Sequence, residues 1–335
     1  MTIKDIAAQT GYSVGTISRV LNNQPNVSQK ARDTILRAAR ECGFQLNANA
    51  KQLKQQHGNS ILVLVKGTHN ELFSSLVEIL QARIAETKYP LIVDYMDESE
   101  NEVLRALQLC REKKPLGILF LGGNRETFLA DFEKITQPSV LVTNDASGFP
   151  FPNLSSVSSD DKLAGRMAME HLISLGHRNI AVISGDRTHS DTGRLRFEGC
   201  LEAFRDHDIP FDPNRDCETV RYTFSDGYKA AQRLLEKGSR FTALFAMSDV
   251  MAIGAIRGLR DAGLRVPEDV SVVGLDGLAI GEYTVPRLAT IEQNVETLAD
   301  RSFRILLEHI ENQATGRYEI LPVSLVDRES ARKID

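Results

Sequence analysis

Residues 2–22 read TIKDIAAQTGYSVGTISRVLN, and this stretch predicts two short helices joined by a tight turn. Thr2 can cap the first helix, because Asp5 stands three residues further on, in the position of the acidic partner of a capping box. Gly11 ends this helix, since glycine readily takes the left-handed conformation found after helix C-termini. Between these two signals one apolar stripe follows the helical spacing i, i+3, i+4: Ile3, Ile6 and Ala7.

Two more helices follow by the same logic. Ser13 caps the second, which is broken by the stretch 22–25 and buries one apolar face: Ile17, Val20 and Leu21. Ser28 caps the third, which stops near Gly43 and turns inward Ile35, Leu36, Ala38 and Ala39. Three short helices with a glycine-containing turn form the helix-turn-helix arrangement, whose second helix fits the major groove of DNA. A three-helix bundle that binds no nucleic acid is the alternative that these features leave open.

Charge is unevenly distributed along the chain. The 335 residues include 40 Lys and Arg against 45 Asp and Glu, a formal net charge of −5. Residues 1–60 hold four Lys and four Arg against two Asp and one Glu, or +5, so the remainder carries −10. A basic N-terminal region on an acidic remainder favours nucleic acid as the partner of that region. A chance surface distribution of charge is the alternative.

The segment 47–55, NANAKQLKQ, contains good helix formers but is shorter than the roughly 12–15 residues that isolated helices need. It offers almost nothing to a core except Ala50 and Leu53. An unprotected leucine on a basic, marginal helix suits a wedge that enters the minor groove between base pairs and kinks the duplex. A plain interdomain linker is the alternative, and the residues by themselves favour it.

Beyond Ser60 the sequence changes to apolar runs that alternate with helical stretches. The runs that predict strands are 61–65, 91–93, 117–121, 140–142, 180–183, 243–246 and 270–273. Helical stretches between them include 73–86, 162–175, 196–206, 226–236 and 249–261. Most of the runs are continuous rather than alternating, which is typical of parallel strands buried on both faces. About ten strands favour two parallel sheets, with the run around 157–161 as a crossover between two lobes.

Polar residues follow several of these strands, and in open α/β sheets ligands bind outside the carboxyl ends of the strands. This set consists of Arg196, Ser248, Asp276 and Gln293. Its mixture of donors and acceptors suits a hydroxyl-rich solute, and Phe73 and Tyr222 could supply apolar faces for a sugar ring. Taken singly, Asp276 could cap a helix and Arg196 could form a surface salt bridge. The position that the four share at strand ends favours a binding site.

The sequence lacks the signatures of catalysis, metal binding and export. It contains no GxxxxGK[ST], GxGxxG, GxSxG or HExxH motif, so we expect no catalytic residue, no metal site and no cofactor. The 4 cysteines are far apart and form no CxxC pair, which fits a reducing compartment. No apolar run reaches the roughly 18 residues of a membrane span, and the first residues include no apolar signal region. We therefore expect a cytoplasmic protein without a membrane partner.

Several spaced motifs occur in a particular order. In the N-terminal region they are TIKDIA (2–7), GYS (11–13), TISRVLN (16–22), VS (27–28) and GF (43–44). Further on they are EHL (170–172) with LGH (175–177), RLRFEG (194–199), SDVMA (248–252), VVGLD (272–276) and TIEQ (290–293). Together these motifs resemble the lactose/galactose repressor (LacI/GalR) family of transcription regulators over essentially the whole chain.

The resemblance implies a domain organisation and an assembly. A helix-turn-helix DNA-binding domain would occupy 1–57, with a hinge helix at about 47–55, and an effector-binding and dimerisation domain would occupy 58–335. The latter would be an α/β body of parallel sheets like periplasmic binding proteins, with three crossovers. Its lobes would comprise about 60–157 with 294–321, and about 158–291 with 322–335. We also expect a homodimer on a pseudo-palindromic operator in double-stranded DNA, because no leucine heptads follow Asp327 to form a tetramer.

The resemblance also implies roles for individual residues in DNA binding. The family reads bases at the positions of Val14, Gly15 and Arg19. It contacts phosphates at the positions of Thr16, Ser18 and Asn22. It inserts a hinge leucine into the minor groove at the position of Leu53. The expected DNA-binding set is Thr2, Ser13, Val14, Gly15, Thr16, Ser18, Arg19, Asn22, Ser28, Asn47, Ala50, Leu53 and Lys54.

For the effector, the expected set is Phe73, Thr143, Arg196, Tyr222, Ser248, Asp276 and Gln293, with Tyr222 the weaker assignment. Some positions depart from the family pattern. Ser248 stands where asparagine is common, and its shorter side chain changes the contacts to a hydroxyl. The other departures are Lys66-Gly67 for Pro-Asp, Thr143 for an acidic residue, Leu46 for the hinge proline and Lys51 for a hinge arginine. They bear on the identity of the effector more than on its existence.

These expectations combine into a DNA-binding regulator of the repressor type. Its operator affinity would be set allosterically by a small molecule, a sugar or sugar derivative. Two alternatives from other classes remain at this point. A solute-binding transport protein would share the fold but has to be exported and has no use for a basic helical region. An α/β enzyme acting on sugars needs a paired acid and base, and Asp276 has no evident partner in the sequence.

Overall fold

The computed structural model describes residues 3–21, 27–41, 58–67, 70–312 and 314–334. The chain forms two compact units, Met1–Gln56 (the head) and His57–Asp335 (the body). Within the described ranges, no helix combines the length and the apolar character that a membrane crossing requires.

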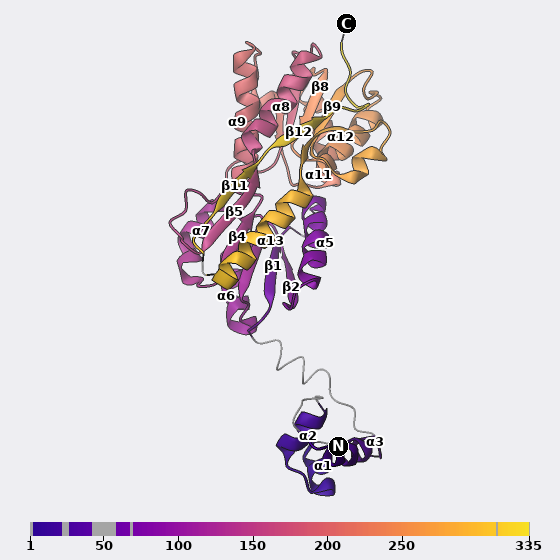
Figure 1. Cartoon of the computed structure of the whole chain (residues 1–335). Helices are drawn as coiled ribbons and strands as arrows, with labels where there is room; N and C mark the ends of the chain where they lie inside the picture. The colour runs from indigo at the N-terminus through magenta and orange to yellow at the C-terminus, as the bar shows by residue number, and fades with distance from the viewer. Residues whose placement is uncertain (1–2, 22–26, 42–57, 68–69, 313, 335) are drawn as a thin grey trace. The chain divides into compact units, whose positions relative to one another are not determined.

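The head is a bundle of three helices, α1 (Ile3–Thr10), α2 (Val14–Leu21) and α3 (Gln29–Glu41). Gly11 has a φ of +71° in the turn between α1 and α2, and its amide donates a hydrogen bond to the carbonyl of Ala7. Apolar side chains from all three helices meet in one core, which is centred on the fully buried Ile6, Ile17 and Ile35. The head is therefore the helix-turn-helix that the caps and stripes of the sequence predict (Figure 1).

One lobe of the body, the N-lobe, is built on a 6-stranded parallel sheet with the strand order β11-β5-β4-β3-β1-β2. Its strands are β1 (Ile61–Lys66), β2 (Leu91–Met96), β3 (Gly117–Leu121), β4 (Ser139–Val142), β5 (Leu154–Ser159) and β11 (Tyr318–Leu321). The central strands β1 and β3 are buried on both faces, which explains why their sequences are continuously apolar.

Helices cover both faces of the N-lobe sheet. α5 (Glu71–Ala85) and α13 (Val295–Asn312) share one core with Val63 and Leu119. The other face, with Leu62 and Phe120, is covered by α6 (Glu102–Lys113), α7 (Arg125–Asp131) and the 3₁₀ turn η1 (Phe132–Lys134). Alternating side chains of the same strands thus supply both cores, as expected for a sheet between two helical layers.

The second lobe, the C-lobe, has a 6-stranded sheet with the strand order β12-β10-β9-β8-β6-β7. Its strands are β6 (Ile180–Ser184), β7 (Cys217–Thr219), β8 (Ala243–Ala246), β9 (Ser271–Asp276), β10 (Ala289–Gln293) and β12 (Val323–Val326). The β10–β12 pair is antiparallel, whereas the sequence suggested parallel strands throughout. The reason is topological: the chain re-enters this lobe directly from β11 of the N-lobe and therefore runs against its neighbour.

The C-lobe helices are α8 (Asp161–Ser174), α9 (Asp191–Asp206), α10 (Pro213–Asp216), α11 (Phe224–Glu236) and α12 (Asp249–Asp261), with the 3₁₀ turn η2 (Ala279–Glu282). α8 and α9 approach each other closely at Gly165. A Cβ atom added at Gly165 would lie 2.0 Å from the backbone oxygen of Arg196, so only glycine permits this packing. The close packing of α8 against α9 therefore fixes the position of Arg196 on α9.

The chain passes between the lobes three times, after β5, after β10 and between β11 and β12. The links are neighbours, because Ser159 pairs with Leu321 in one sheet and Gln293 pairs with Val323 in the other. The first link is shorter than the run 157–161 suggested, since 157–159 belong to β5 and α8 begins at Asp161. We name the three links, at residues 160, 294 and 322, the hinge.

Candidate functional site

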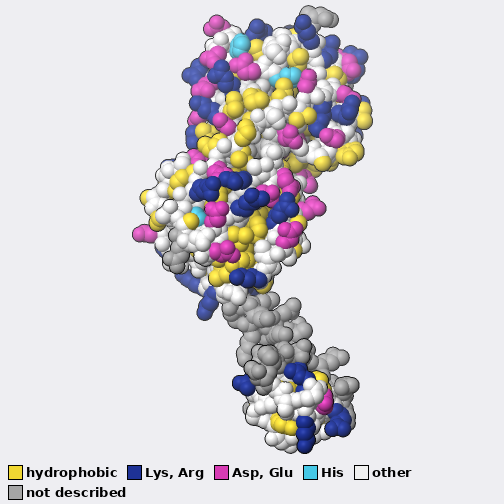
Figure 2. Space-filling model, viewed as in Figure 1, with side chains coloured by type: hydrophobic (Ala, Val, Ile, Leu, Met, Phe, Trp, Pro, Cys, Tyr) yellow, Lys and Arg dark blue, Asp and Glu magenta, His cyan; other side chains and the backbone are white. Residues whose placement is uncertain are grey.

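In the head, α2 presents an exposed face at the positions expected to read bases. Val14 is 46% exposed, and Gly15 and Arg19 are exposed as well, while Ile17 on the opposite face is buried. On the visible side of the head most of the described charged side chains are Lys and Arg (Figure 2). A helix whose first residues and a cation project in this way can enter a major groove and contact base edges.

Two of the expected DNA contacts also act as helix caps. Ser13 Oγ accepts a hydrogen bond from the Thr16 amide at 3.2 Å, and Ser28 Oγ accepts one from the Ala31 amide at 3.4 Å. Several expected DNA-binding residues lie outside the described residues: Thr2, Asn22, Asn47, Ala50, Leu53 and Lys54. The side chain of Ser18, within α2, is likewise outside what the structure describes.

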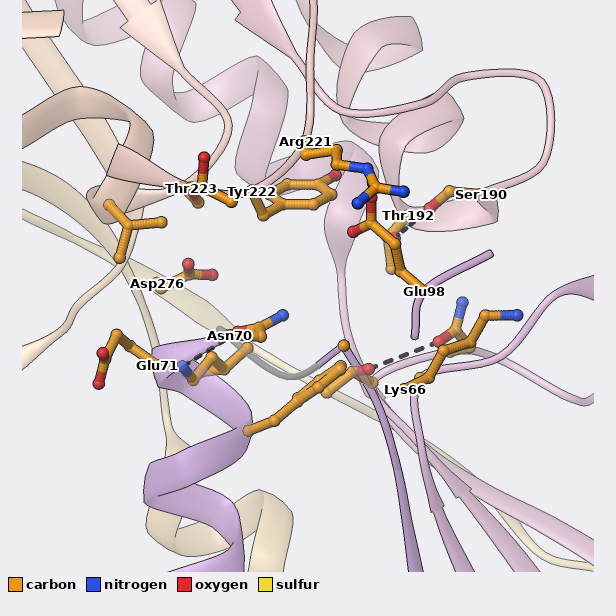
Figure 3. A pocket seen from close by; sticks show the side chains of 18 of the residues that line it. Lys66, Asn70, Glu71, Glu98, Ser190, Thr192, Arg221, Tyr222, Thr223 and Asp276 are labelled. Atoms are coloured by element: carbon orange, nitrogen blue, oxygen red, sulfur yellow. Dashed lines mark hydrogen bonds and ion pairs between the residues drawn. The ribbon is translucent and has the colours of Figure 1, made fainter. Parts of the chain in front are cut away.

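In the body, a pocket of ≈ 340 Å³ lies between the lobes, where the carboxyl ends of strands from both sheets meet. This volume falls within the range of about 300–1,000 Å³ typical of small-molecule sites. Tyr222, Thr223 and Asp276 lie on the C-lobe wall, opposite Lys66 and Asn70 of the N-lobe (Figure 3). Six of the expected effector residues line the pocket: Phe73, Thr143, Arg196, Tyr222, Ser248 and Asp276. The seventh, Gln293, is hydrogen-bonded to Asp276.

Arg196 is a buried cation rather than a surface ion pair. Its Nε donates to Oδ1 of Asp161 at 2.7 Å, and its Nη1 donates to the carbonyl of Met247 at 2.8 Å. The side chains of Arg196 and Asp161 are only 6% and 5% exposed. Burial by itself lowers the pKa of Arg196, but the charge of Asp161 raises it above the ordinary value, so Arg196 stays charged.

Asp276 ends β9 with a φ of +125°, a backbone conformation rare for any residue with a side chain. Its Oδ1 accepts a hydrogen bond from Nε2 of Gln293 at 2.7 Å. Burial raises the pKa of the Asp276 carboxyl, the charge of Arg196 opposes this, and the nearby Asp249 carboxylate raises the pKa further. Thr143, at the end of β4 in the other lobe, has a φ of +76°. Strained backbone of this kind concentrates at binding sites.

The raised pKa of Asp276 predicts a pH-dependent stability. The folded chain holds this proton more tightly than the unfolded chain does. The resulting stabilisation is present below the ordinary aspartate pKa and is lost as pH rises through the folded-state pKa. Asp276→Asn cannot ionise, so its unfolding free energy should fall less than that of the wild type between about pH 5 and about pH 8, by roughly 1 kcal/mol or more. Denaturant titrations at both pH values measure this difference.

The control for this prediction is Asp208→Asn. Asp208 also has a positive φ, +54°, but is exposed. Its substitution removes one carboxylate from the surface and so measures how much of any change comes from net charge alone. Parallel pH profiles for Asp276→Asn and the wild type would show that burial of Asp276 carries no such linkage.

Tyr222 contributes a buried hydroxyl that has no hydrogen-bond partner in the described part of the chain. Gly185, just after β6, makes room for the ring, because a Cβ there would lie 2.1 Å from the phenol oxygen. Burial raises the pKa of Tyr222 to about 12, so the phenol is neutral. An unpartnered buried hydroxyl costs stability unless something bonds to it, and a ligand hydroxyl in the pocket would do so.

The N-lobe wall of the pocket combines an aromatic ring with a lysine whose charge is paired with a buried carboxylate. The ring of Phe73, on α5, packs over Gly122, where a Cβ would lie 3.0 Å from the ring. Lys66, at the end of β1, forms an ion pair with Glu102, whose side chain is 1% exposed. Glu102 also accepts a hydrogen bond from the Asn124 amide at 2.6 Å. The departure from the family pattern at Lys66 thus places a paired lysine at the pocket.

An ion pair joins the two lobes across the pocket. Arg221 follows β7 in the C-lobe, whereas Asp97 and Glu98 follow β2 in the N-lobe. The Nε of Arg221 donates to Oε1 of Glu98 at 2.6 Å (Figure 3). The Nη2 of Arg221 lies 3.7 Å from Oδ1 of Asp97. All three residues line the pocket, so this pair forms only when the lobes are close enough to enclose it.

Sequence reasoning missed several residues of the pocket: Lys66 as a lining residue, Asn70, Glu71, Asp97, Glu98, Ser190, Thr192, Arg221 and Thr223. A signal for some of them was available. Asn70, Ser190 and Thr223 cap helices that start shortly after a strand, and such caps lie at the carboxyl edge of a parallel sheet.

The arrangement suits reversible binding of a polar, hydroxylated molecule. Acceptors, donors and an aromatic face stand on opposing walls, which is how proteins orient sugars and related compounds. Among the described residues, no cluster of three or more His, Cys, Asp and Glu side chains has the proximity that a metal ion needs.

Comparison with known proteins assigns both units. Residues 2–47 match the family described as "Bacterial regulatory proteins, lacI family", and residues 169–331 match "Periplasmic binding protein-like domain". The HTH-type transcriptional regulator MalR of Clostridium butyricum is 34% identical to this chain, over 100% of each. The lac repressor dimer bound to operator and the anti-inducer ONPF is similar with a TM-score of 0.78 and 27% identity, over 99% of each chain.

A second solved structure, a complex of the transcriptional regulator CelR with cellobiose, is similar with a TM-score of 0.72 and 27% identity. That match covers 99% of this chain and 100% of the other. Full-length similarity to these regulators agrees with the helix-turn-helix head and the two-lobed α/β body. The chain belongs to the lacI family of bacterial regulatory proteins.

Proposed function

We propose that this regulator is a repressor that binds its operator as a homodimer and changes operator affinity when a sugar or sugar derivative fills the pocket. The observation that carries the proposal is that six expected effector residues, drawn from both lobes, line one pocket in a chain with a DNA-binding head. Solved relatives support the sugar class, since one of them is a complex with cellobiose. Membership in a family of regulators argues against an exported binding protein and against a sugar enzyme.

On DNA, each copy of the dimer places α2 in the major groove of one half-site of a pseudo-palindromic operator. Val14, Gly15 and Arg19 face the bases, and Leu53 enters the minor groove between the half-sites. A related dimer has been solved on its operator, which supports this mode of assembly. Because the target is chromosomal DNA in a bacterium, the protein acts in the cytoplasm.

The hinge supplies the coupling between pocket and DNA. A ligand that contacts both walls stabilises one arrangement of the lobes over another, and β1 begins at Ile61, a few residues after the segment 47–55. A change in the N-lobes of the dimer therefore changes whether the segments 47–55 of the two copies can pair on DNA. This is a shift in population between two states, so operator DNA must change effector affinity by the same factor.

The test is to titrate the full-length dimer onto fragments of its own genome, with and without a panel of sugars. We expect a small number of fragments to bind specifically, with affinity that falls steeply as salt rises because bound Lys and Arg displace counterions. At least one sugar should change operator affinity. Failure of every genomic fragment to bind, in the presence and absence of sugars, would reject the proposal.

Arg19 offers a direct test of base recognition. Arg19→Ala should weaken operator binding by about 1–3 kcal/mol and relax discrimination at one base pair, because the substitution removes a base contact. Fluorescence anisotropy on the operator and on single-base variants measures both effects. Arg37→Ala, an exposed cation of α3, serves as the comparison and should weaken all sequences alike or not at all. Equal losses on operator and random DNA for Arg19→Ala would mean that Arg19 contacts only phosphate.

The ion pair across the pocket predicts a kinetic effect. Arg221→Met removes a contact that exists only in the closed arrangement, so the bound sugar should dissociate faster, within about fivefold because exposed ion pairs are screened by water. Glu98→Gln should have the same effect, and the double variant should add nothing more. Arg257→Met is the control, since its ion pair with Asp261 lies within one helix. Additive losses in the double variant would show that the two side chains act independently.

A further inference from the structure

The cations that line the pocket are already neutralised. The described lining residues include three basic side chains, one lysine and two arginines. Each is paired with a carboxylate: Lys66 with Glu102, Arg196 with Asp161 and Arg221 with Glu98. Glu102 and Asp161 are almost fully buried, so a ligand anion could take over the lysine or Arg196 only by leaving a buried carboxylate unpaired. That exchange is strongly unfavourable.

Helix N-termini are the other common anion sites in proteins, because their free amides and the helix dipole favour negative charge. Four helices begin at this pocket, and each is capped by one of its own lining side chains: Asn70 of α5, Ser190 of α9, Thr223 of α11 and Ser248 of α12. Each also has a carboxylate in its first turn: Glu71, Asp191, Asp226 and Asp249. At each of these helices the chain itself therefore already bonds one free amide and places a negative charge near the positive end.

The remaining charges at the pocket are negative. Glu71 and Asp97 line it in addition to the three ion pairs, and Asp97 lies 3.7 Å from the already paired Arg221. Two glycine amides at strand ends, which elsewhere cradle phosphates, donate instead to backbone carbonyls: Gly67 to Met96 and Gly122 to Val142. A phosphate or carboxylate on a ligand would be taken out of water toward carboxylates, without a free counter-charge among the described residues.

We propose that the pocket selects an uncharged polyhydroxy ligand and rejects the phosphorylated or carboxylated form of the same compound. This inference rests on the proposed function, because it takes the pocket to be the effector site. Groups that remain for hydroxyls include the orphan phenol of Tyr222, the strained Asp276 carboxyl and the buried Asn144 amide. Neutral hydroxyls can both donate to and accept from these groups, whereas a phosphate dianion can only accept.

The first experiment titrates inorganic phosphate, then sulfate, into the full-length protein by calorimetry at matched ionic strength. We expect no binding heat beyond that of chloride. Binding of phosphate that Lys66→Met or Arg221→Met removes would overturn the inference, because it would show a usable cation at the pocket. This outcome does not depend on which sugar is the effector or on whether DNA binding responds to it.

The second experiment compares neutral sugars with their own phosphates or carboxylates, for example glucose with glucose 6-phosphate and with gluconate. The neutral member of a binding pair should bind at least about a hundredfold more tightly. A phosphorylated sugar that binds as tightly as its parent would overturn the inference. If no member of any pair bound, the proposed sugar effector would be contradicted. The phosphate titration would still decide whether the pocket rejects anions.

Variants that release a cation should allow the pocket to bind an anion. Glu98→Gln removes the closer partner of the exposed Arg221 and leaves only its longer contact with Asp97. Glu102→Gln frees Lys66 while keeping an amide oxygen for the backbone amide of Asn124. Each variant should gain measurable affinity for inorganic phosphate. Glu133→Gln, which removes an exposed acid outside the pocket, should gain none. Gain in the control equal to that in Glu98→Gln and Glu102→Gln would assign the effect to net charge and reject local pairing as its cause.

Discussion

Arg196→Met is expected to lower the unfolding free energy of the body by about 3–5 kcal/mol, because it leaves the Asp161 carboxylate buried without its counter-charge. The guanidinium also holds the carbonyl of Met247, so the start of α12 loses an anchor. Sugar binding should be lost as well, since Arg196 lines the pocket beside Asp276. Denaturant unfolding followed by circular dichroism measures the first effect and calorimetry the second.

Three comparisons separate the buried ion pair from a general loss of charge. Arg194→Met, two residues earlier on α9, removes an arginine that is 46% exposed and should cost at most about 1 kcal/mol. Arg196→Lys keeps the charge but not the planar fork, so it should fall between wild type and Arg196→Met. Adding Asp161→Asn to Arg196→Met should restore part of the stability. A loss for Arg196→Met no larger than that for Arg194→Met would contradict the role given to this pair.

Gly165→Ala is expected to destabilise the C-lobe by about 1–3 kcal/mol or more, because its Cβ would lie 2.0 Å from the Arg196 oxygen and 2.8 Å from its carbonyl carbon. Backbone atoms cannot rotate away as a side chain can, so α8 and α9 would have to separate. The separation moves Arg196 relative to the pocket, so affinity for the effector should fall together with stability. Equilibrium unfolding and sugar titration on the same preparation check both results.

A second helical glycine provides the control. At Gly15 in α2 an added Cβ would meet nothing closer than Ser13 Oγ, at 3.8 Å. Gly15→Ala should therefore stabilise the head by up to about 1 kcal/mol, through helix propensity alone. If Gly165→Ala were as harmless as Gly15→Ala, the close helix packing described for α8 and α9 would be wrong.

Elements marked by local signals could be predicted from the sequence. Gly11 and the caps Ser13 and Ser28 define the head, because capping and left-handed turns depend on residues only a few positions apart. The apolar strands such as β1 and β3 are equally local in origin. These signals yielded the helix-turn-helix and the α/β alternation without any knowledge of tertiary contacts.

β5 could not be predicted, since its sequence LSSVSS offers neither apolar continuity nor alternation. Two of its buried serines are instead satisfied by distant partners. Ser155 Oγ accepts from the Arg317 amide at 3.0 Å, and Ser156 Oγ accepts from the Ala146 amide at 2.9 Å. A strand whose polar groups are matched across the fold becomes recognisable only when the neighbouring strands are in place.

Some residues of the pocket could likewise be predicted from the sequence, and others could not. Arg196 and Asp276 could be found because both belong to motifs near strand ends, and the structure brings them together with Tyr222 and Ser248. The ion pair of Arg221 with Glu98 could not, because its partners come from different lobes and meet only through the way the lobes close. The pairing that neutralises Lys66 could not be predicted either, because Glu102 lies 36 residues away in the sequence and the two side chains meet only in the folded N-lobe.

The hinge has a practical consequence. Its three covalent links run side by side and define one axis. The two lobes can rotate about this axis but can scarcely slide or twist against each other. Binding of a ligand in the pocket is therefore expressed as a change in a single angle between the lobes. Two fluorophores, one on the outer surface of each lobe, would convert that angle into an energy-transfer signal. This makes the chain a candidate scaffold for a reagentless sugar sensor.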